Sequence, residues 1–70
     1  MKVKKLLKKI PDDQVVGIYD QNGSWEKQRA FVFKNYKYWR ELKVKSIWGG
    51  IFRDNGCVNI TVYEDLEKHL

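Results

Sequence analysis

Few side chains of this 70-residue chain have the types and spacing that catalysis or metal binding requires. Cys57 is the single cysteine and His69 the single histidine, so the sequence offers no paired nucleophile and base, no internal disulfide and no Cys/His zinc site. Asp12 and Asp13 are adjacent within a turn, where they cap backbone groups more readily than they share a proton. Gly49-Gly50 lacks the following lysine of a phosphate-binding loop. We therefore expect a protein without catalytic activity, metal or cofactor, in which Cys57 is a structural thiol.

Lysines are concentrated at the start of the chain and again near its middle, within a net charge of +5. A short docked helix needs a solvated outer face, and this alone accounts for such lysines. The alternative is contact with phosphate groups, where each lysine releases counterions and affinity falls with salt. The candidate anion-binding or nucleic-acid-binding residues are Lys4, Lys5, Lys8, Lys9 and Lys37.

Aromatic residues form a second candidate surface. Trp48, Phe52 and Tyr63 are expected on one face of a C-terminal hairpin, as core, as a dimer contact or as a stacking platform for single-stranded nucleic acid. Tyr38 and Arg40 are of types enriched in binding hot spots, and a helix would place them at the edge of its buried face. These five residues are the candidate interface.

The N-terminal part of the chain predicts a helix followed by two strands. Its apolar residues have the spacing of one helical face, and they are Val3, Leu6, Leu7 and Ile10. This pattern predicts a helix over 3–10 that ends before Pro11. The β-branched run 14–20 predicts a strand, and the Asn22-Gly23 turn leads into a short second strand over 25–28.

The stretch 29–42 has two interpretations. As a helix, it places most of its apolar side chains on one broad face, which consists of Phe31, Val32, Tyr36, Trp39 and Leu42. That helix leaves Phe33 among the charged residues of the opposite face. As a strand, 29–33 continues the preceding hairpin, and only 36–42 is helical. We favour the helix.

The C-terminal part predicts a hairpin of two strands over 43–52 and 57–63, joined by an Asn55-Gly56 turn. In that register Ile51 faces Ile60. The elements together predict a single α+β domain over residues 1–70, because a chain this short supports one core. We expect a small, mostly antiparallel sheet of three or four strands with two helices on one face, in the order α-β-(β)-α-β-β.

The opening Val3-Lys4-Lys5-Leu6-Leu7 runs into Ile10-Pro11-Asp12-Asp13, a strand follows over 16–20, and the chain ends with strands over 44–47 and 58–62. This layout resembles small uncharacterised proteins encoded by bacterial phages and prophages. The resemblance implies an accessory protein of phage type and no particular function. No stretch approaches the roughly 20 apolar residues that span a bilayer, and the lone cysteine indicates a reducing, cytoplasmic location.

The sequence leads us to expect a non-enzymatic interaction module that binds a protein partner or itself. The alternative is an accessory protein that binds nucleic acid unspecifically through the N-terminal lysines and an aromatic sheet face. A continuous basic stripe from Lys4, Lys8 and Lys37 to the aromatic face favours nucleic acid. Scattered lysines beside an apolar patch larger than a few hundred Å² favour a protein partner.

Overall fold

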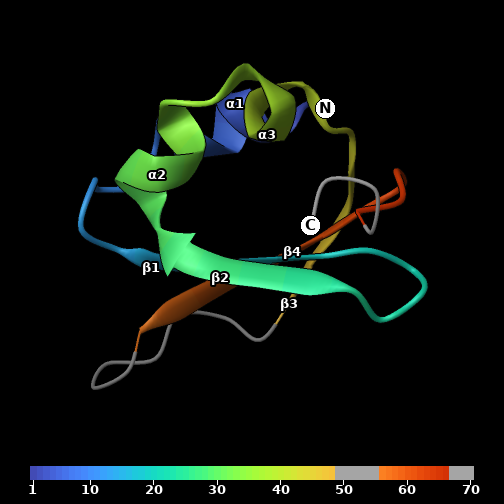
Figure 1. Ribbon diagram of the computed structural model, residues 1–70. Helices are drawn as coiled ribbons and strands as arrows, with labels where there is room; N and C mark the ends of the chain where they lie inside the picture. The colour runs from blue at the N-terminus through green and yellow to red at the C-terminus, as the bar shows by residue number, and fades with distance from the viewer. Residues whose placement is uncertain (49–55, 67–70) are drawn as a thin grey trace.

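The computed structural model describes residues 1–48 and 56–66, which form three short helices and a four-stranded sheet. The helices are α1 (Val3–Leu7), α2 (Ala30–Lys34) and α3 (Lys37–Glu41), and the strands are β1 (Val15–Tyr19), β2 (Trp25–Arg29), β3 (Val44–Trp48) and β4 (Cys57–Val62). All three helices lie on the same face of the sheet (Figure 1). The predicted α+β class is confirmed. Every helix among the described residues is too short and too polar to cross a lipid bilayer.

The four strands lie in the order β2-β1-β4-β3. The outer pairs, β1 with β2 and β3 with β4, are antiparallel, whereas the central pair of β1 and β4 is parallel. A parallel pair needs a long crossover, and here β2, both helices α2 and α3, and β3 lie between β1 and β4 in the sequence. The sheet is therefore mixed, and its central parallel pair was not predicted.

The N-terminal helix is shorter than the predicted range 3–10. It ends at Leu7, and the backbone N–H groups of Lys9 and Ile10 donate to the carbonyl oxygens of Leu6 and Leu7, three residues back. Such bonds tighten the chain after a last helical turn. The predicted apolar stripe nevertheless docks, because Val3 and Leu7 are buried and Leu6 and Ile10 pack against the core.

The single helix predicted over 29–42 is wrong, because the chain forms α2 and α3 with a break between them. Asn35 ends α2, and Tyr36 is extended, with φ −122° and ψ 123°. In one continuous helix, Phe33 and Trp39 would lie about a third of a turn apart. The break lets Phe33 become fully buried and meet Trp39 edge-on, with ring centroids 4.9 Å apart. Burial of Phe33 thus accounts for the break.

Two further expectations for this stretch also fail. The alternative strand over 29–33 is wrong, because β2 ends at Arg29 and the helix α2 begins at Ala30. Phe31 and Tyr36, expected on the buried face, are 45% and 60% exposed.

The predicted register of the C-terminal hairpin is wrong by four residues. Ile47 lies opposite Ile60; Asn55 of the predicted turn lies outside the described residues. A shift by an even number of residues keeps every side chain on the same face of the strand. The hydrophobic pattern alone therefore does not distinguish Ile47 from Ile51, which lies outside the described residues.

The core lies between the helices and the two central strands. Its buried apolar residues are Val3, Leu7, Val16, Ile18, Ala30, Phe33, Trp39, Leu42, Val58, Ile60, Val62 and Leu66. The strand register places Val16 beside Val58 and Ile18 beside Ile60 on the face that the helices cover. The opposite face, which none of the described helices covers, is called the helix-free face below. The described strand residues on it are Val15, Gly17, Tyr19, Trp25, Lys27, Arg29, Ser46, Cys57, Asn59 and Thr61.

Candidate binding surfaces

The β1–β2 hairpin builds an aromatic pair on the helix-free face. Tyr19 lies opposite Trp25 across the turn, and their ring centroids are 6.3 Å apart with the rings tilted by 33°. Trp25 is 53% exposed. Lys27 follows two residues later on the same face, and its Nζ lies over the Trp25 ring, 5.9 Å from the centroid. This distance is within the range of a cation–π interaction. The hairpin thus presents a large, partly ordered aromatic side chain with a cation above it.

Gly17 provides the space in which the Tyr19 ring rests. A Cβ atom at Gly17 would lie 2.8 Å from Cε1 of Tyr19 and 3.0 Å from Oδ1 of Asn59. Contacts this short do not occur without movement of a neighbour. The glycine therefore positions Tyr19, and through Tyr19 it positions the exposed Trp25.

Asp20 ties the same hairpin to the C-terminal segment. Its Oδ1 accepts hydrogen bonds from the backbone N–H groups of Asn22 and Ser24, at 2.8 and 2.9 Å. Its Oδ2 accepts the N–H of Leu66 at 2.8 Å. The Leu66 hydrogen bond is the main reason that the pKa of Asp20 lies below its ordinary value, against the opposing effect of burial. The sequence interpretation assigned no such role to Asp20.

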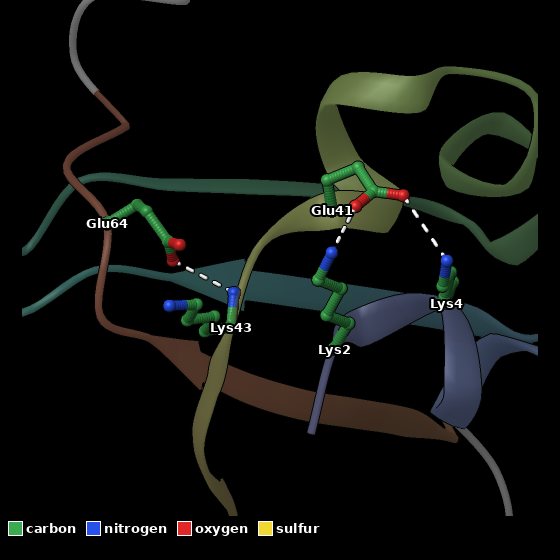
Figure 2. Close-up of polar contacts among 5 residues, drawn as sticks. All are labelled: Lys2, Lys4, Glu41, Lys43 and Glu64. Carbon is green, nitrogen blue, oxygen red and sulfur yellow. Dashed lines mark hydrogen bonds and ion pairs between the residues drawn. The ribbon is translucent and has the colours of Figure 1, made fainter.

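The N-terminal lysines differ in how far they are paired. Glu41 of α3 lies between two of them: its Oε1 is 2.5 Å from Nζ of Lys2, and its Oε2 is 3.5 Å from Nζ of Lys4 (Figure 2). The hydrogen bond from Lys2 is the largest cause that lowers the pKa of Glu41. Glu41 therefore holds Lys4 only weakly, because Lys2 makes the closer contact with it. Figure 2 also shows the hydrogen bond that the backbone N–H of Lys43 donates to Glu64. Its donor–acceptor distance is 2.9 Å.

Lys4 and Lys8 line a pocket between the three helices. Its other lining residues are Leu7, Lys34 and Arg40, and its volume is about 340 Å³. Two of the predicted anion-binding lysines are thus brought together with two further cations. The remaining three, Lys5, Lys9 and Lys37, are exposed and lie apart from this pocket.

The basic pocket and the aromatic pair lie on opposite sides of the sheet. The pocket belongs to the helical layer, whereas Tyr19 and Trp25 lie on the helix-free face. The continuous stripe expected for a nucleic-acid-binding protein, from Lys4, Lys8 and Lys37 to the face of Trp48, Phe52 and Tyr63, stays a prediction, because the side chain of Trp48 and all of Phe52 lie outside the described residues.

Three of the five predicted interface residues, Tyr38, Arg40 and Tyr63, are among the described residues. Tyr38 is half-buried and meets Trp39 edge-on at 5.1 Å, and burial is the first cause that raises the pKa of its hydroxyl, before the nearby carboxylates. Arg40 lines the pocket instead. Tyr63 follows the end of β4 and is 58% exposed.

The other two predicted interface residues are Trp48 and Phe52, of which the structure describes only the backbone of Trp48. The backbone of Trp48 lies opposite Asn59 in the sheet. The side chain of Trp48 and all of Phe52 lie outside the described residues.

Sequence reasoning missed the Tyr19–Trp25 pair. A two-residue Asn22-Gly23 turn would pair Tyr19 with Glu26, whereas the loop formed by residues 20–24 pairs Tyr19 with Trp25. The turn signal thus predicts the hairpin but not these partners. No sequence signal indicated Lys34 and Arg40 either, because their place in the pocket depends on the break between α2 and α3.

Cys57 is half-buried, and its thiol donates to Oδ1 of Asn59 at 3.4 Å. Within residues 1–48 and 56–66, no three side chains of the metal-ligating types lie close enough to hold an ion. Comparison of the chain with protein-family models, with curated proteins and with solved structures gives no match.

Proposed function

We propose that the protein is a non-enzymatic binding module whose helix-free face binds an acidic surface of a partner protein. The proposal is carried by one observation: Trp25 is half exposed on this face, yet it is held in place by Tyr19 on the neighbouring strand and by Lys27 above its ring.

Aromatic residues and arginine are the types that dominate binding energy in protein interfaces. A side chain that is already ordered loses little conformational entropy on binding. Trp25 satisfies both conditions, and Arg29 lies further along the same face of the same strand. These residues support an interface centred on the β2 edge of the sheet.

The charges of the helix-free face favour an acidic partner over a second copy of the chain. Its described strand residues include the cations Lys27 and Arg29 and no carboxylate. Two copies that met through this face would place like charges together, which is costly in an interface. An acidic protein surface would offset them.

The alternative partner is single-stranded nucleic acid stacked on Trp25, and two observations weigh against it. Lys27 and Tyr19 already pack against the Trp25 ring that a base would use. The described strand residues of the face also supply only two cations, and Arg29 donates one hydrogen bond to the carbonyl oxygen of Asp13 at 2.9 Å. With about −0.7 per phosphate contact for single strands, two contacts give a salt slope near −1.4, typical of weak unspecific binding.

The phage or prophage origin of such a module is supported by the sequence resemblance alone. A cytoplasmic location is supported by the lone cysteine.

The test is an affinity capture from the native host with wild-type protein, Trp25→Ala and the matched control Tyr36→Ala, each with and without nuclease. Tyr36 is a comparably exposed aromatic residue that directly precedes α3 in the helical layer. We expect a protein retained by wild type and Tyr36→Ala, lost with Trp25→Ala and unaffected by nuclease.

A partner retained equally by Trp25→Ala contradicts the proposal. Loss of the partner on nuclease treatment favours nucleic acid, and a direct titration then decides. Micromolar binding of an oligothymidylate at 150 mM salt that requires Trp25 replaces the protein partner with single-stranded nucleic acid.

A further inference from the structure

The pocket between the helices has an unusual balance of charge. Four of its five lining residues are cations: Lys4 from α1, Lys8 directly after α1, Lys34 from α2 and Arg40 from α3. Leu7, which is buried, supplies an apolar part of the wall. Lys4 and Lys8 are four residues apart on one side of a helix, a spacing at which like charges destabilise the helix. The fold therefore brings together cations that repel each other.

The cations of this pocket are not equally satisfied by the protein. Lys34 is fully used, because its Nζ lies 2.6 Å from both Oδ1 of Asp12 and the carbonyl oxygen of Ile10. Lys4 shares Glu41 with Lys2 and has the longer contact of 3.5 Å. The structure records no polar partner for the Lys8 ammonium among the described residues.

Arg40 provides the strongest sign of an absent ligand. Its Nε atom is buried, and it has no hydrogen-bond acceptor within the described part of the chain. Buried donors are nearly always paired, and a guanidinium needs acceptors most because it carries a charge. Residues 1–48 and 56–66 hold no recorded acceptor for the rest of this guanidinium either, and Arg40 as a whole is only half-buried. An anion between Lys8 and the accessible part of the guanidinium would pair with both charges and relieve the repulsion.

We infer that this pocket binds a phosphate monoester with a small apolar substituent. Guanidinium and ammonium groups together are the preferred partners of a phosphate, with arginine supplying paired donors and lysine a point charge. The volume of about 340 Å³ is near the lower bound for small-molecule sites, roughly 300 Å³. It exceeds what one inorganic anion needs, and Leu7 offers the remaining space to an apolar group. This site is separate from the helix-free face and does not depend on the proposed partner protein.

The test is isothermal titration of the full chain at 150 mM salt with phenyl phosphate, inorganic phosphate and a short oligothymidylate. Variants are Lys8→Gln, Arg40→Gln and Arg40→Lys, with Lys5→Gln and Lys9→Gln as controls that change the net charge equally but lie outside the pocket. We expect saturable binding of phenyl phosphate, tighter than that of inorganic phosphate. Loss of one charge-assisted hydrogen bond should weaken it about tenfold or more in Lys8→Gln and Arg40→Gln, and not in Lys5→Gln or Lys9→Gln.

The Arg40→Lys variant keeps the charge but removes the paired donors of the guanidinium, so it should also weaken binding; its circular dichroism verifies the fold. Lys8 is exposed, so Lys8→Gln tests the site even if both Arg40 variants unfold. Equal weakening by all lysine variants would show only general attraction by the net charge and would overturn the inference. Absence of saturable binding of phenyl phosphate overturns it as well. Tighter binding of the oligothymidylate through Lys8 and Arg40 would make the pocket a contact for a nucleic-acid backbone and reject the small ligand.

Discussion

At the scale of single residues, Asp20 joins two parts of the chain that are far apart in sequence. One of its carboxylate oxygens closes the β1–β2 turn through Asn22 and Ser24, and the other accepts the N–H of Leu66. Leu66 is fully buried. The ionised carboxylate therefore holds both the turn that orients Trp25 and the C-terminal segment.

This arrangement predicts an acid-sensitive fold. The pKa of Asp20 is lower in the folded protein than its ordinary value, so its stabilising effect is complete above the unfolded pKa, near 3.9. The effect is lost as the pH falls below that value. In urea unfolding of the wild type, the urea concentration at the midpoint should fall as the pH is lowered from 7 to 3. This midpoint should fall less in Asp20→Asn, whereas the exposed control Asp13→Asn should follow the wild type. A wild-type slope in Asp20→Asn would contradict this role.

Gly17 makes a second prediction at this scale. A methyl group at position 17 would collide with the Tyr19 ring, so Gly17→Ala should destabilise the protein by about 1–3 kcal/mol, as overpacking does. Chemical denaturation measures this loss. In a Tyr19→Ala background the penalty should shrink, because the two changes are coupled through one contact. If the losses of unfolding free energy in Gly17→Ala and Tyr19→Ala are additive, the position of the Tyr19 ring does not depend on Gly17.

At the scale of elements, the sequence correctly predicted the features that depend on residues close together in the chain. The hairpin of β1 and β2 followed from its β-branched run and its Asn22-Gly23 turn. The apolar stripe of α1 followed from helical spacing. The break between α2 and α3 did not follow, because it is determined by the burial of Phe33 against Trp39, a requirement of the whole core.

The same distinction applies to the candidate sites. Lys4 and Lys8 were predicted from composition as anion-binding residues, but their position in one pocket with Arg40 depends on how the three helices pack. The Tyr19–Trp25 pair did not follow from the Asn22-Gly23 turn, because a two-residue turn there would place Tyr19 opposite Glu26, one residue out of the register that forms. The register of β3 against β4 was not accessible, because Ile47 and Ile51 fit the same face equally well.

The docking of α1 makes the prediction at this scale. Leu7 is 2% exposed in the core, so Leu7→Ala should destabilise by roughly 2–4 kcal/mol, as core truncations do. That is most of the stability of about 3–5 kcal/mol that so small a core supplies. Lys5→Ala, on the exposed side of the same helix, should have little effect. Thermal melting compares the two variants, and an unchanged melting temperature in Leu7→Ala would show that α1 does not support the fold.

At the scale of the whole molecule, two surfaces of different character lie on opposite sides of one small sheet. The helical layer carries the cationic pocket, and the helix-free face carries the ordered Trp25. Such a separation permits a small ligand and a partner protein to bind at the same time.

The net charge of the chain predicts its oligomeric state in the absence of a partner. A net charge of +5, with Lys27 and Arg29 beside Trp25, opposes pairing of two copies through the helix-free face. Sedimentation at 150 mM salt should therefore report a monomer up to several hundred micromolar. A dimer that dissociates on Trp25→Ala would contradict the preference for a different partner and would make the helix-free face a self-association surface.

The central claim is that the helix-free face binds a protein, and site-specific photo-crosslinking tests it most directly. A benzoylphenylalanine residue replaces Ser46, an exposed residue of β3 on the helix-free face, in one variant and Lys5, on the helical layer, in the other; both are expressed in the native host and irradiated. The account predicts a discrete protein adduct from position 46 that resists nuclease, and none from position 5. An adduct from position 5 alone, or an adduct at position 46 that nuclease removes, would contradict it.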